Sequence, residues 1–294
     1  MRVLAILSIL CSMLLGCTRV FFQPMPQLVR NPSDIGLKYE DVWLRTEGGL
    51  RLHAWFLPSV GTATGTVLFL HGNAENISTH LGAVAWLPEK NFNVFLLDYG
   101  GYGRSEGTPS IAGALDDIDA AMTHLVARTD IDNLRIAIFG QSLGGALGIL
   151  YVARSRYRTN IRGLITDSAF SSFRGIAKEK LRASWPLRAL ATPLSWTISN
   201  SFRPIDAIAR VAPIPVLIFH GEADSIVPVS HAQRLFEAAR EPKEIWRFPK
   251  ATHIASLTQE GARQRFVQSL EAQMREPVFT TPAMETGKLH TFRE

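Results

Sequence analysis

Short apolar runs alternate along the chain with segments of helical periodicity, and this alternation constrains the fold more than any other feature. The apolar runs are 66–70, 92–97, 134–139, 161–166 and 214–219, and the helical segments are 80–90, 111–127, 143–155, 231–240 and 259–274. Continuous apolar runs of this length are typical of strands buried on both faces of a parallel sheet. The pattern predicts an α/β fold with a mostly parallel central sheet flanked by helices on both faces. Ligands are then expected at the carboxyl ends of the strands.

Two segments outside this series predict strands of another kind. Residues 40–46 and 50–57 alternate polar and apolar side chains around Glu47-Gly48-Gly49, which predicts an antiparallel hairpin. The shorter, mixed run 245–248 fits a strand at the edge of the sheet.

Ser142 lies in Gly140-Gln141-Ser142-Leu143-Gly144, between a predicted strand and a predicted helix. Strand, tight turn and helix in this order are what a nucleophile elbow needs. Because the turn is strained, small residues are required two positions before and two positions after the serine, and Gly140 and Gly144 meet this need. Gly145 lets the helix pack close to the sheet. The alternative is a plain turn in which the serine only caps the helix.

A serine nucleophile needs a base and an acid that orients the base. In a hydrolase of this architecture the chain order is nucleophile, acid, base. Asp224 follows the run 214–219 and His253 follows the last strand, so both lie at strand ends in the required order. Asp167 also ends a strand and is the alternative acid, although a structural role near the pocket suits it better.

Five motifs in this order resemble the α/β-hydrolases, and in particular the Bem46-like group with a fold of the serine aminopeptidase type. They are 71–76 (His71-Gly72-Asn73-Ala74-Glu75-Asn76), 98–107, the elbow, the loop of Asp224 and the final histidine, within about 40–272. Gly100 departs from the family, where an arginine is usual. The resemblance implies an oxyanion hole made by the backbone N–H groups of Leu143 and Asn73.

The other histidines and glycines predict no further chemistry. His71 and His220 each precede a glycine at a strand end and are expected to be structural, and His231 is expected on the surface. Gly101-Tyr102-Gly103 lacks the spacing of a dinucleotide-binding loop. No histidine pair has metalloprotease spacing. We therefore expect neither a cofactor nor a metal.

The N-terminus predicts export. Arg2, the apolar segment 3–15 and Gly16-Cys17 form a signal peptide that is too short to span a bilayer. Leu14-Leu15-Gly16-Cys17 resembles the bacterial lipobox, which implies that residues 1–16 are removed and Cys17 carries acyl chains such as palmitate. Thr18 in place of aspartate implies the outer membrane, on its periplasmic side. A conventional secretory signal and an uncleaved anchor are the alternatives.

Composition agrees with an exported protein. The only two cysteines of the 294 residues, Cys11 and Cys17, lie in the leader, which excludes disulfides and a cysteine nucleophile in the body. The net charge is +5, but the basic residues are spread through helices and loops, with no Arg- or Lys-rich stripe that carries interleaved aromatics, so no nucleic-acid partner is expected. We expect a tether over 17–38, a hydrolase domain over 39–276 and a mobile tail over 277–294.

The segment 170–212 is unusually long for a connection between two strands. Its apolar and basic residues predict a helical cap, either a lid over an acyl pocket or an ordinary pair of amphipathic helices. The sequence as a whole predicts a membrane-anchored serine hydrolase that acts on carboxylic, lipid-like esters. An aminopeptidase, amidase or thioesterase is the enzymatic alternative, and a non-catalytic envelope binding protein is the other. The sequence does not predict the oligomeric state.

Overall fold

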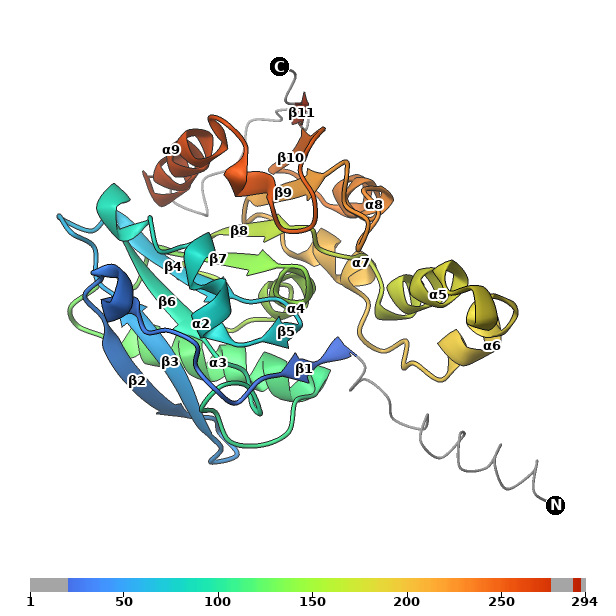
Figure 1. The fold of residues 1–294 in the computed structure, drawn as a ribbon. Helices are drawn as coiled ribbons and strands as arrows, with labels where there is room; N and C mark the ends of the chain where they lie inside the picture. Colours follow the sequence, from blue (N-terminus) through green and yellow to red (C-terminus); the bar gives the residue numbers. More distant parts are fainter. Residues whose placement is uncertain (1–20, 276–287, 292–294) are drawn as a thin grey trace.

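The computed structural model describes residues 21–275 and 288–291, and its core is a nine-stranded sheet (Figure 1). The strand order is β11-β10-β9-β8-β7-β4-β6-β3-β2; only the pairs β2–β3 and β3–β6 are antiparallel. The strands are β2 (Glu40–Arg45), β3 (Arg51–Leu57), β4 (Gly65–Leu70), β6 (Phe92–Leu97), β7 (Ile136–Gln141), β8 (Ile161–Asp167), β9 (Val216–Gly221), β10 (Lys243–Phe248) and β11 (Lys288–Thr291). The predicted mostly parallel α/β fold and the predicted hairpin are confirmed.

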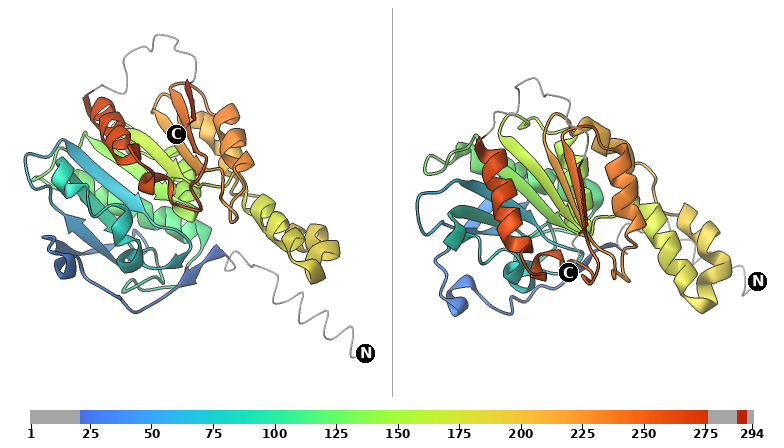
Figure 2. Two further views of the ribbon diagram at one scale, coloured as in Figure 1. Left: turned by 45° about the horizontal axis from the view of Figure 1, so that its top comes forward. Right: turned by 90° about the horizontal axis from the view of Figure 1, so that it is seen from above.

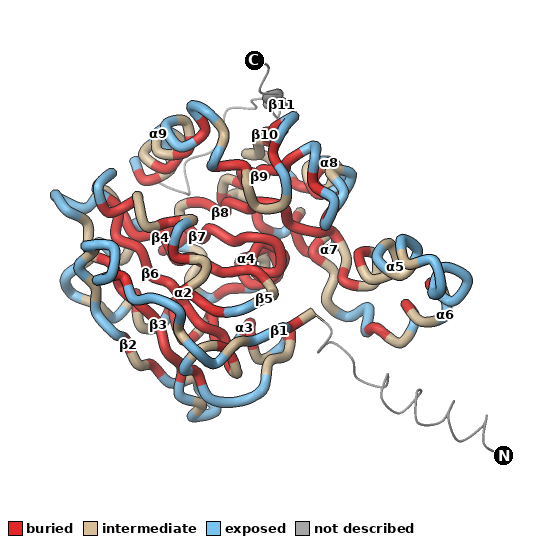
Figure 3. Tube along the Cα trace, viewed as in Figure 1, coloured by how far each residue is buried: buried red, intermediate tan, exposed pale blue. Residues whose placement is uncertain are grey.

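Helices cover both faces of the sheet, because successive side chains of a buried strand point to opposite faces. In β4, Leu68 and Leu70 belong to one apolar core, and Val67 and Phe69 belong to the other. The first core is covered by α3 (Ile111–Ala127), α4 (Leu143–Val152) and α8 (Ser230–Ala238); the second is covered by α2 (Ile77–His80) and α9 (Ala262–Arg275). The strands of the sheet are mostly buried, and the exposed residues lie on the outer helices and loops (Figure 3).

The continuous helix predicted over 80–90 is wrong. The structure has α2 and two 3-10 turns, η3 (Leu81–Ala83) and η4 (Pro88–Lys90). Gly82 weakens a helix, and Pro88 has no N–H with which to continue one. The apolar side chains of this segment still face the sheet. The periodicity therefore predicted the buried face correctly, although the helix is not continuous.

The folded body begins earlier than the predicted boundary at residue 39. Phe22 is buried, and β1 (Gln23–Pro24) pairs in parallel with β5 (Ala74–Glu75). The Asn76 side chain donates hydrogen bonds to the carbonyls of Met25 and Gln27, at 2.8 and 2.7 Å. A 3-10 turn, η2 (Pro32–Ile35), follows. The expected tether is therefore packed on the body from Phe21 onward, while the predicted leader and Cys17 lie outside the described residues.

The C-terminal prediction also needs a correction. Residues 288–291 form β11, which pairs in parallel with β10 and makes β10 an interior strand. The physical reason is that an edge strand presents unpaired N–H and C=O groups to which another segment can bind. Residues 276–287 and 292–294 of the expected tail lie outside the described part of the chain.

The cap predicted over 170–212 is helical and lies between β8 and β9. It comprises α5 (Phe173–Ala183), η5 (Trp185–Leu190), α6 (Ala191–Trp196), α7 (Pro204–Ala207) and η6 (Ile208–Arg210). Helices α5 and α6 project away from the sheet beside the carboxyl ends of its strands (Figures 1 and 2). Of the helices within the described residues, none is both long and apolar enough to cross a bilayer.

Asp117 makes the stability of the fold dependent on pH. It is buried on α3 and accepts a hydrogen bond from the backbone N–H of Gly100 at 2.8 Å. Burial raises its pKa to about 7. The folded state therefore binds a proton that the unfolded state has lost between about pH 4 and pH 7, so stability falls as the pH rises through this range.

We expect Asp117→Asn to keep the acceptor oxygen and to remove this loss. Its free energy of unfolding should exceed that of the wild type by up to about 4 kcal/mol at pH 8, with little difference near pH 4. Urea unfolding across this pH range measures the effect, and Asp116→Asn on the exposed side of the same helix is the control. A difference that does not change with pH would contradict the assignment.

Candidate active site

Ser142 joins the end of β7 to the start of α4 in a conformation that L-residues rarely adopt, with φ 52° and ψ −110°. Its N–H donates to the carbonyl of Asp167 at 2.8 Å. A side chain at Gly144 would collide with the carbonyl of Leu70, and one at Gly140 would collide with the backbone of Gly144. The two glycines are therefore required by close approach, as the motif predicts, and the hydroxyl is held at the carboxyl edge of the sheet.

His253 lies within hydrogen-bonding distance of both Ser142 and Asp224. His253 Nε2 is 3.0 Å from Ser142 Oγ, and His253 Nδ1 is 2.8 Å from Asp224 Oδ2. The three residues are far apart in the sequence, and the structure brings them together at the ends of β7, β9 and β10. Their arrangement is a nucleophile, a base and an orienting acid.

Asp224 is held as a carboxylate. Its side chain is fully buried, and Oδ1 accepts the backbone N–H groups of Ile226 and Val227, each at 2.8 Å. Burial alone would raise its pKa, but the hydrogen bond from His253 and the backbone donors lower it below the usual value. An ionised Asp224 keeps the Nδ1 proton on the imidazole, which leaves Nε2 to accept the serine proton.

Asp167, the alternative acid, contacts the histidine loop and not the imidazole. Its carboxylate accepts hydrogen bonds from Ser256 Oγ at 2.6 Å and Gln141 Nε2 at 3.3 Å. Burial raises its pKa to about 6. The neighbouring Ser168 hydroxyl accepts the N–H of Ile254 at 3.0 Å. Asp167 therefore ties the loop that carries His253 to the end of β8, which fits the structural role expected for it.

His71 orients the loop expected to form the oxyanion hole. Its Nδ1 lies 2.8 Å from the carbonyl oxygen of Gly72, an acceptor, so Nδ1 carries the proton and donates it. In a trans peptide the N–H points opposite to the C=O, so fixing the Gly72 carbonyl directs the N–H of Asn73 to the other side. Tyr102 adds a second restraint, since its hydroxyl donates to the carbonyl of Asn73 at 2.7 Å. The expected structural histidine is thus placed directly behind the expected oxyanion donor.

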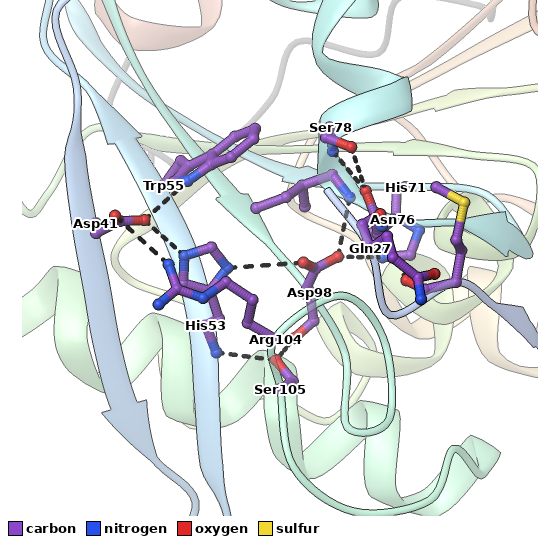
Figure 4. A network of polar contacts seen from close by, with 12 residues as sticks. Gln27, Asp41, His53, Trp55, His71, Asn76, Ser78, Asp98, Arg104 and Ser105 are labelled. Carbon is purple, nitrogen blue, oxygen red and sulfur yellow. Dashed lines mark hydrogen bonds and ion pairs between the residues drawn. The ribbon is translucent and has the colours of Figure 1, made fainter. Parts of the chain in front are cut away.

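A chain of buried polar groups continues from His71 to the protein surface (Figure 4). Asp98, at the end of β6, lies between His71 and His53, 3.5 Å from His71 Nε2 and 3.8 Å from His53 Nδ1. It also accepts the N–H of Ile77 at 2.9 Å, at the start of α2. Burial raises the pKa of Asp98 and lowers that of His71 well below its usual range. His53 Nε2 ends the chain at Asp41 on β2, 2.7 Å away.

Sequence reasoning missed this polar chain because its members come from separate elements. Asp41 and His53 belong to the predicted hairpin, where a polar residue is expected to face water. His53 falls at a polar position of the alternation, so the only local signal is that Trp55 and Leu57, on the same face of the strand, are apolar and indicate that this face is buried as well.

An apolar cavity of about 500 Å³ opens in front of Ser142. Asn73 and Leu143 line it beside the serine, so both expected oxyanion donors face the same space. The cap supplies most of the remaining wall, with Phe170, Ile176, Ala177, Lys180, Leu181, Ser184, Leu187, Leu194, Thr197 and Ile198. The segment before β2 adds Phe21 and Gln23, and the loop of Asp224 adds Ile226 and Val227. Among the described residues that line the cavity there is no acidic side chain.

His220 and His231 take structural positions. His220 Nε2 donates to the carbonyl of Val227 at 2.7 Å and so shapes the loop of Asp224. His231 was expected on the surface, and this is wrong, because its side chain, in the first turn of α8, is buried where α8 meets the cap. Its Nδ1 accepts the N–H of Ser171 at 3.0 Å, and its Nε2 lies 2.9 Å from Glu179 on α5. Within the described chain, no cluster of three or more His, Cys, Asp or Glu side chains could hold a metal ion.

Comparison with known proteins places the chain in a family. Residues 61–205 match the family described as serine aminopeptidase, S33. The chain is 41% identical to the uncharacterized protein YfhR of Escherichia coli K12 over 223 residues, 74% of this chain and 75% of the relative. It is 30% identical to the protein bem46 of Schizosaccharomyces pombe over 245 residues, 82% of this chain and 79% of the relative.

A solved structure gives the same answer for the fold. An esterase of Pyrococcus furiosus superimposes with a TM-score of 0.69 and 20% identity, covering 87% of this chain and 97% of the esterase. At this identity the likeness shows the fold alone. The chain belongs to the α/β-hydrolase family, in its Bem46-like group.

The restraint on the Asn73 carbonyl can be tested with a tyrosine that loses only its hydroxyl. If Tyr102 helps to direct the oxyanion loop, Tyr102→Phe should lower kcat about 10-fold and leave KM nearly unchanged, because whole oxyanion donors contribute about 100- to 1,000-fold. The control is Tyr151→Phe, which removes a similar hydrogen bond to Asp119, at 2.9 Å, near the far end of α4. Equal kcat values for the two variants would show that Tyr102 has no positioning role.

Proposed function

We propose that this protein is a serine hydrolase that cleaves carboxylic esters through an acyl-enzyme. The observation that carries the proposal is the continuous hydrogen-bonded chain from Asp224 through His253 to Ser142, which ends at an apolar cavity. Membership of the α/β-hydrolase family supports a hydrolase, and the geometry supports the particular residues.

In the first half-reaction Ser142 Oγ attacks the acyl carbonyl carbon while His253 Nε2 takes the hydroxyl proton. The carbonyl π electrons move to oxygen, and the backbone N–H groups of Leu143 and Asn73 stabilise the resulting oxyanion. When the tetrahedral adduct collapses, the ester C–O bond breaks and His253 gives its proton to the leaving alkoxide. Water, deprotonated by the same imidazole, then attacks the acyl-enzyme and releases the carboxylic acid and Ser142.

The lining of the cavity supports an uncharged acyl group over a peptide N-terminus. An aminopeptidase needs an acidic side chain near the scissile bond to hold the substrate amine. Three glutamates follow the carboxyl ends of strands and are the candidates for this role: Glu75, Glu106 and Glu222. Glu222 pairs with Arg247 at 2.8 Å, and Glu106 accepts the N–H of Arg51 at 3.2 Å. The cavity is lined by none of these three glutamates. Thioesters and amides react with a serine nucleophile by the same steps. The proposal of an ester as the substrate bond therefore rests on the apolar lining of the cavity alone.

The catalytic serine is tested with a fluorophosphonate probe. The wild type should be labelled and Ser142→Ala should not, with a loss of esterase activity of about 10⁴-fold or more, because the triad acts as a unit. Asp224→Asn should also lose about 10⁴-fold, since the imidazole then holds the wrong tautomer. Labelling that persists in Ser142→Ala would refute the assignment.

Substrate class is tested with the same purified enzyme. We expect p-nitrophenyl esters with medium apolar chains to exceed the acetyl ester in kcat/KM, and to exceed aminoacyl p-nitroanilides. Faster cleavage of the anilides would establish the aminopeptidase alternative. A fully folded wild type that cleaves none of these substrates and resists the probe would favour the non-catalytic binding protein.

We also propose that the protein is an envelope lipoprotein anchored through Cys17, on the periplasmic side of the outer membrane. The lipobox-like Leu14-Leu15-Gly16-Cys17 supports this proposal. The expectation is that Cys17→Ser leaves the precursor uncut or releases the protein from the membrane fraction. Membrane fractionation and mobility on a denaturing gel measure both outcomes. A variant that fractionates and migrates like the wild type would contradict lipidation.

A further inference from the structure

Large apolar side chains are exposed together on the outer end of the cap. We call Trp185, Leu187, Leu190 and Trp196 the cap tip; they are 89%, 38%, 52% and 67% exposed. In the described part of the chain, nine large hydrophobic side chains are exposed, and these four fall within a stretch of twelve residues. Tryptophan is favoured where an apolar phase meets water, so its concentration here indicates an interface. The projecting position of α5 and α6 leaves this end uncovered (Figures 1 and 3).

The cap also holds the excess positive charge of the protein. The cap, residues 170–212, contains seven basic and two acidic side chains, whereas the remaining sequence contains 24 of each. Of the two acidic residues, Glu179 faces His231 and Arg234 on α8, and Asp206 pairs with Arg203. Lys178, Arg182 and Arg188 make no ion pair within the described residues. The cap therefore carries a net positive charge, whereas the rest of the protein has equal numbers of basic and acidic side chains.

A groove beside Trp196 is lined by three basic residues of the cap. It measures about 310 Å³, and Arg174, Lys178 and Arg203 line it together with the polar side chains of Ser195 and Asn200. Of the three, Arg203 is already paired with Asp206, at 2.9 Å. Arg174 donates to the carbonyl of Ile198 at 2.8 Å, which holds its guanidinium in place. A cationic groove next to an exposed indole matches a phosphate headgroup next to an acyl layer.

The start of the described chain lies on the same side of the molecule. Phe21 packs edge-on against Phe173, with the ring centroids 5.1 Å apart, and stacks on Phe170 at 6.3 Å, at the base of the cap. Cys17 is four residues earlier in the sequence, so the chain can place it at most about 14 Å from Phe21. Cys17, the residue proposed to carry the acyl chains, is thus joined to the body next to the cap.

We propose that the cap tip docks on the surface of an anionic phospholipid bilayer. The two indoles and two leucines lie at the level of the headgroups, and the basic residues of the cap bind the anionic lipids. Leu187 belongs both to the cap tip and to the wall of the cavity. An acyl chain can therefore pass from the lipid surface to Ser142 along one apolar path. Docking itself does not depend on catalysis, so it can be tested apart from the proposed activity.

The experiment uses the full chain with Cys11→Ser and Cys17→Ser, so that one introduced thiol carries an environment-sensitive dye. Leu190→Cys reports on the cap tip. Leu134→Cys is the matched control, because Leu134 is 50% exposed and precedes β7, at the opposite end of the sheet from Ser142. With vesicles of phosphatidylcholine and phosphatidylglycerol, emission should shift to the blue at residue 190 and remain unchanged at residue 134. Repeating the measurement with Ser142→Ala should give the same shift, whatever the fate of the proposed activity.

Charge variants test whether the basic residues of the cap bind an anionic lipid surface. Each basic residue removed should lower the docking constant about fivefold, so Arg182→Glu with Arg188→Glu should lower it about 25-fold or more. Arg154→Glu with Arg240→Glu, which changes the net charge equally on exposed parts of the body, should have little effect. Equal dye shifts at both labelled positions would overturn the proposal, as would an equal shift on pure phosphatidylcholine. A shift that grows with protein concentration in the absence of vesicles would overturn it in favour of a second copy of the chain.

Discussion

The backbone of Ser142 is held in a conformation that costs about 1–3 kcal/mol, and the whole site depends on what holds it there. The turn persists because β7, β8 and α4 over-determine it: the Ser142 N–H binds the carbonyl of Asp167, and only glycine fits at residues 140 and 144. The strain places the hydroxyl where the imidazole of His253 can reach it. Without that turn, the histidine and the aspartate would have no partner to act upon.

The loops around the serine are positioned by groups that never need to touch a substrate. His71 fixes the peptide of Asn73 from behind, and Asp167 fixes the loop of His253. Both are buried polar residues, and each would be costly to leave unpaired. A site built in this way is set before the substrate arrives, which is the condition for electrostatic stabilisation of a transition state. The same polar contacts specify the register of the strands, because a shift of one strand by a residue would leave several buried polar groups without hydrogen-bond partners.

Much of the fold and the three central residues of the site could be predicted because their signals are local. A buried strand, a tight turn and a glycine-rich helix fall within about twenty residues around Ser142, and apolar runs report burial directly. The errors concern contacts between distant segments. The burial of His231 depends on the cap, and the packing of Phe22 and β1 depends on β5, about fifty residues away. The polar chain from Asp41 to His71 joins residues on or directly after four strands, β2, β3, β6 and β4, which periodicity treats separately. No single segment carries a signal for such pairings. The aromatic pair Phe21-Phe22 in the expected tether is a signal of apolar side chains to bury, and the sequence prediction did not use it.

Phe21 both lines the cavity and lies four residues from the cysteine proposed to carry the anchor. An anchor on Cys17, as proposed, would confine the active site to a thin layer above one leaflet of the membrane. A hydrolase held in this way would search for its substrate in two dimensions, and its encounter rate would follow the surface density of substrate and not the bulk concentration. A longer connection between the anchor and Phe21 would let the body move away from the lipid and would replace this lateral search by a search in solution. With the proposed anchor, the packing of Phe21 would therefore determine in how many dimensions the protein searches for substrate.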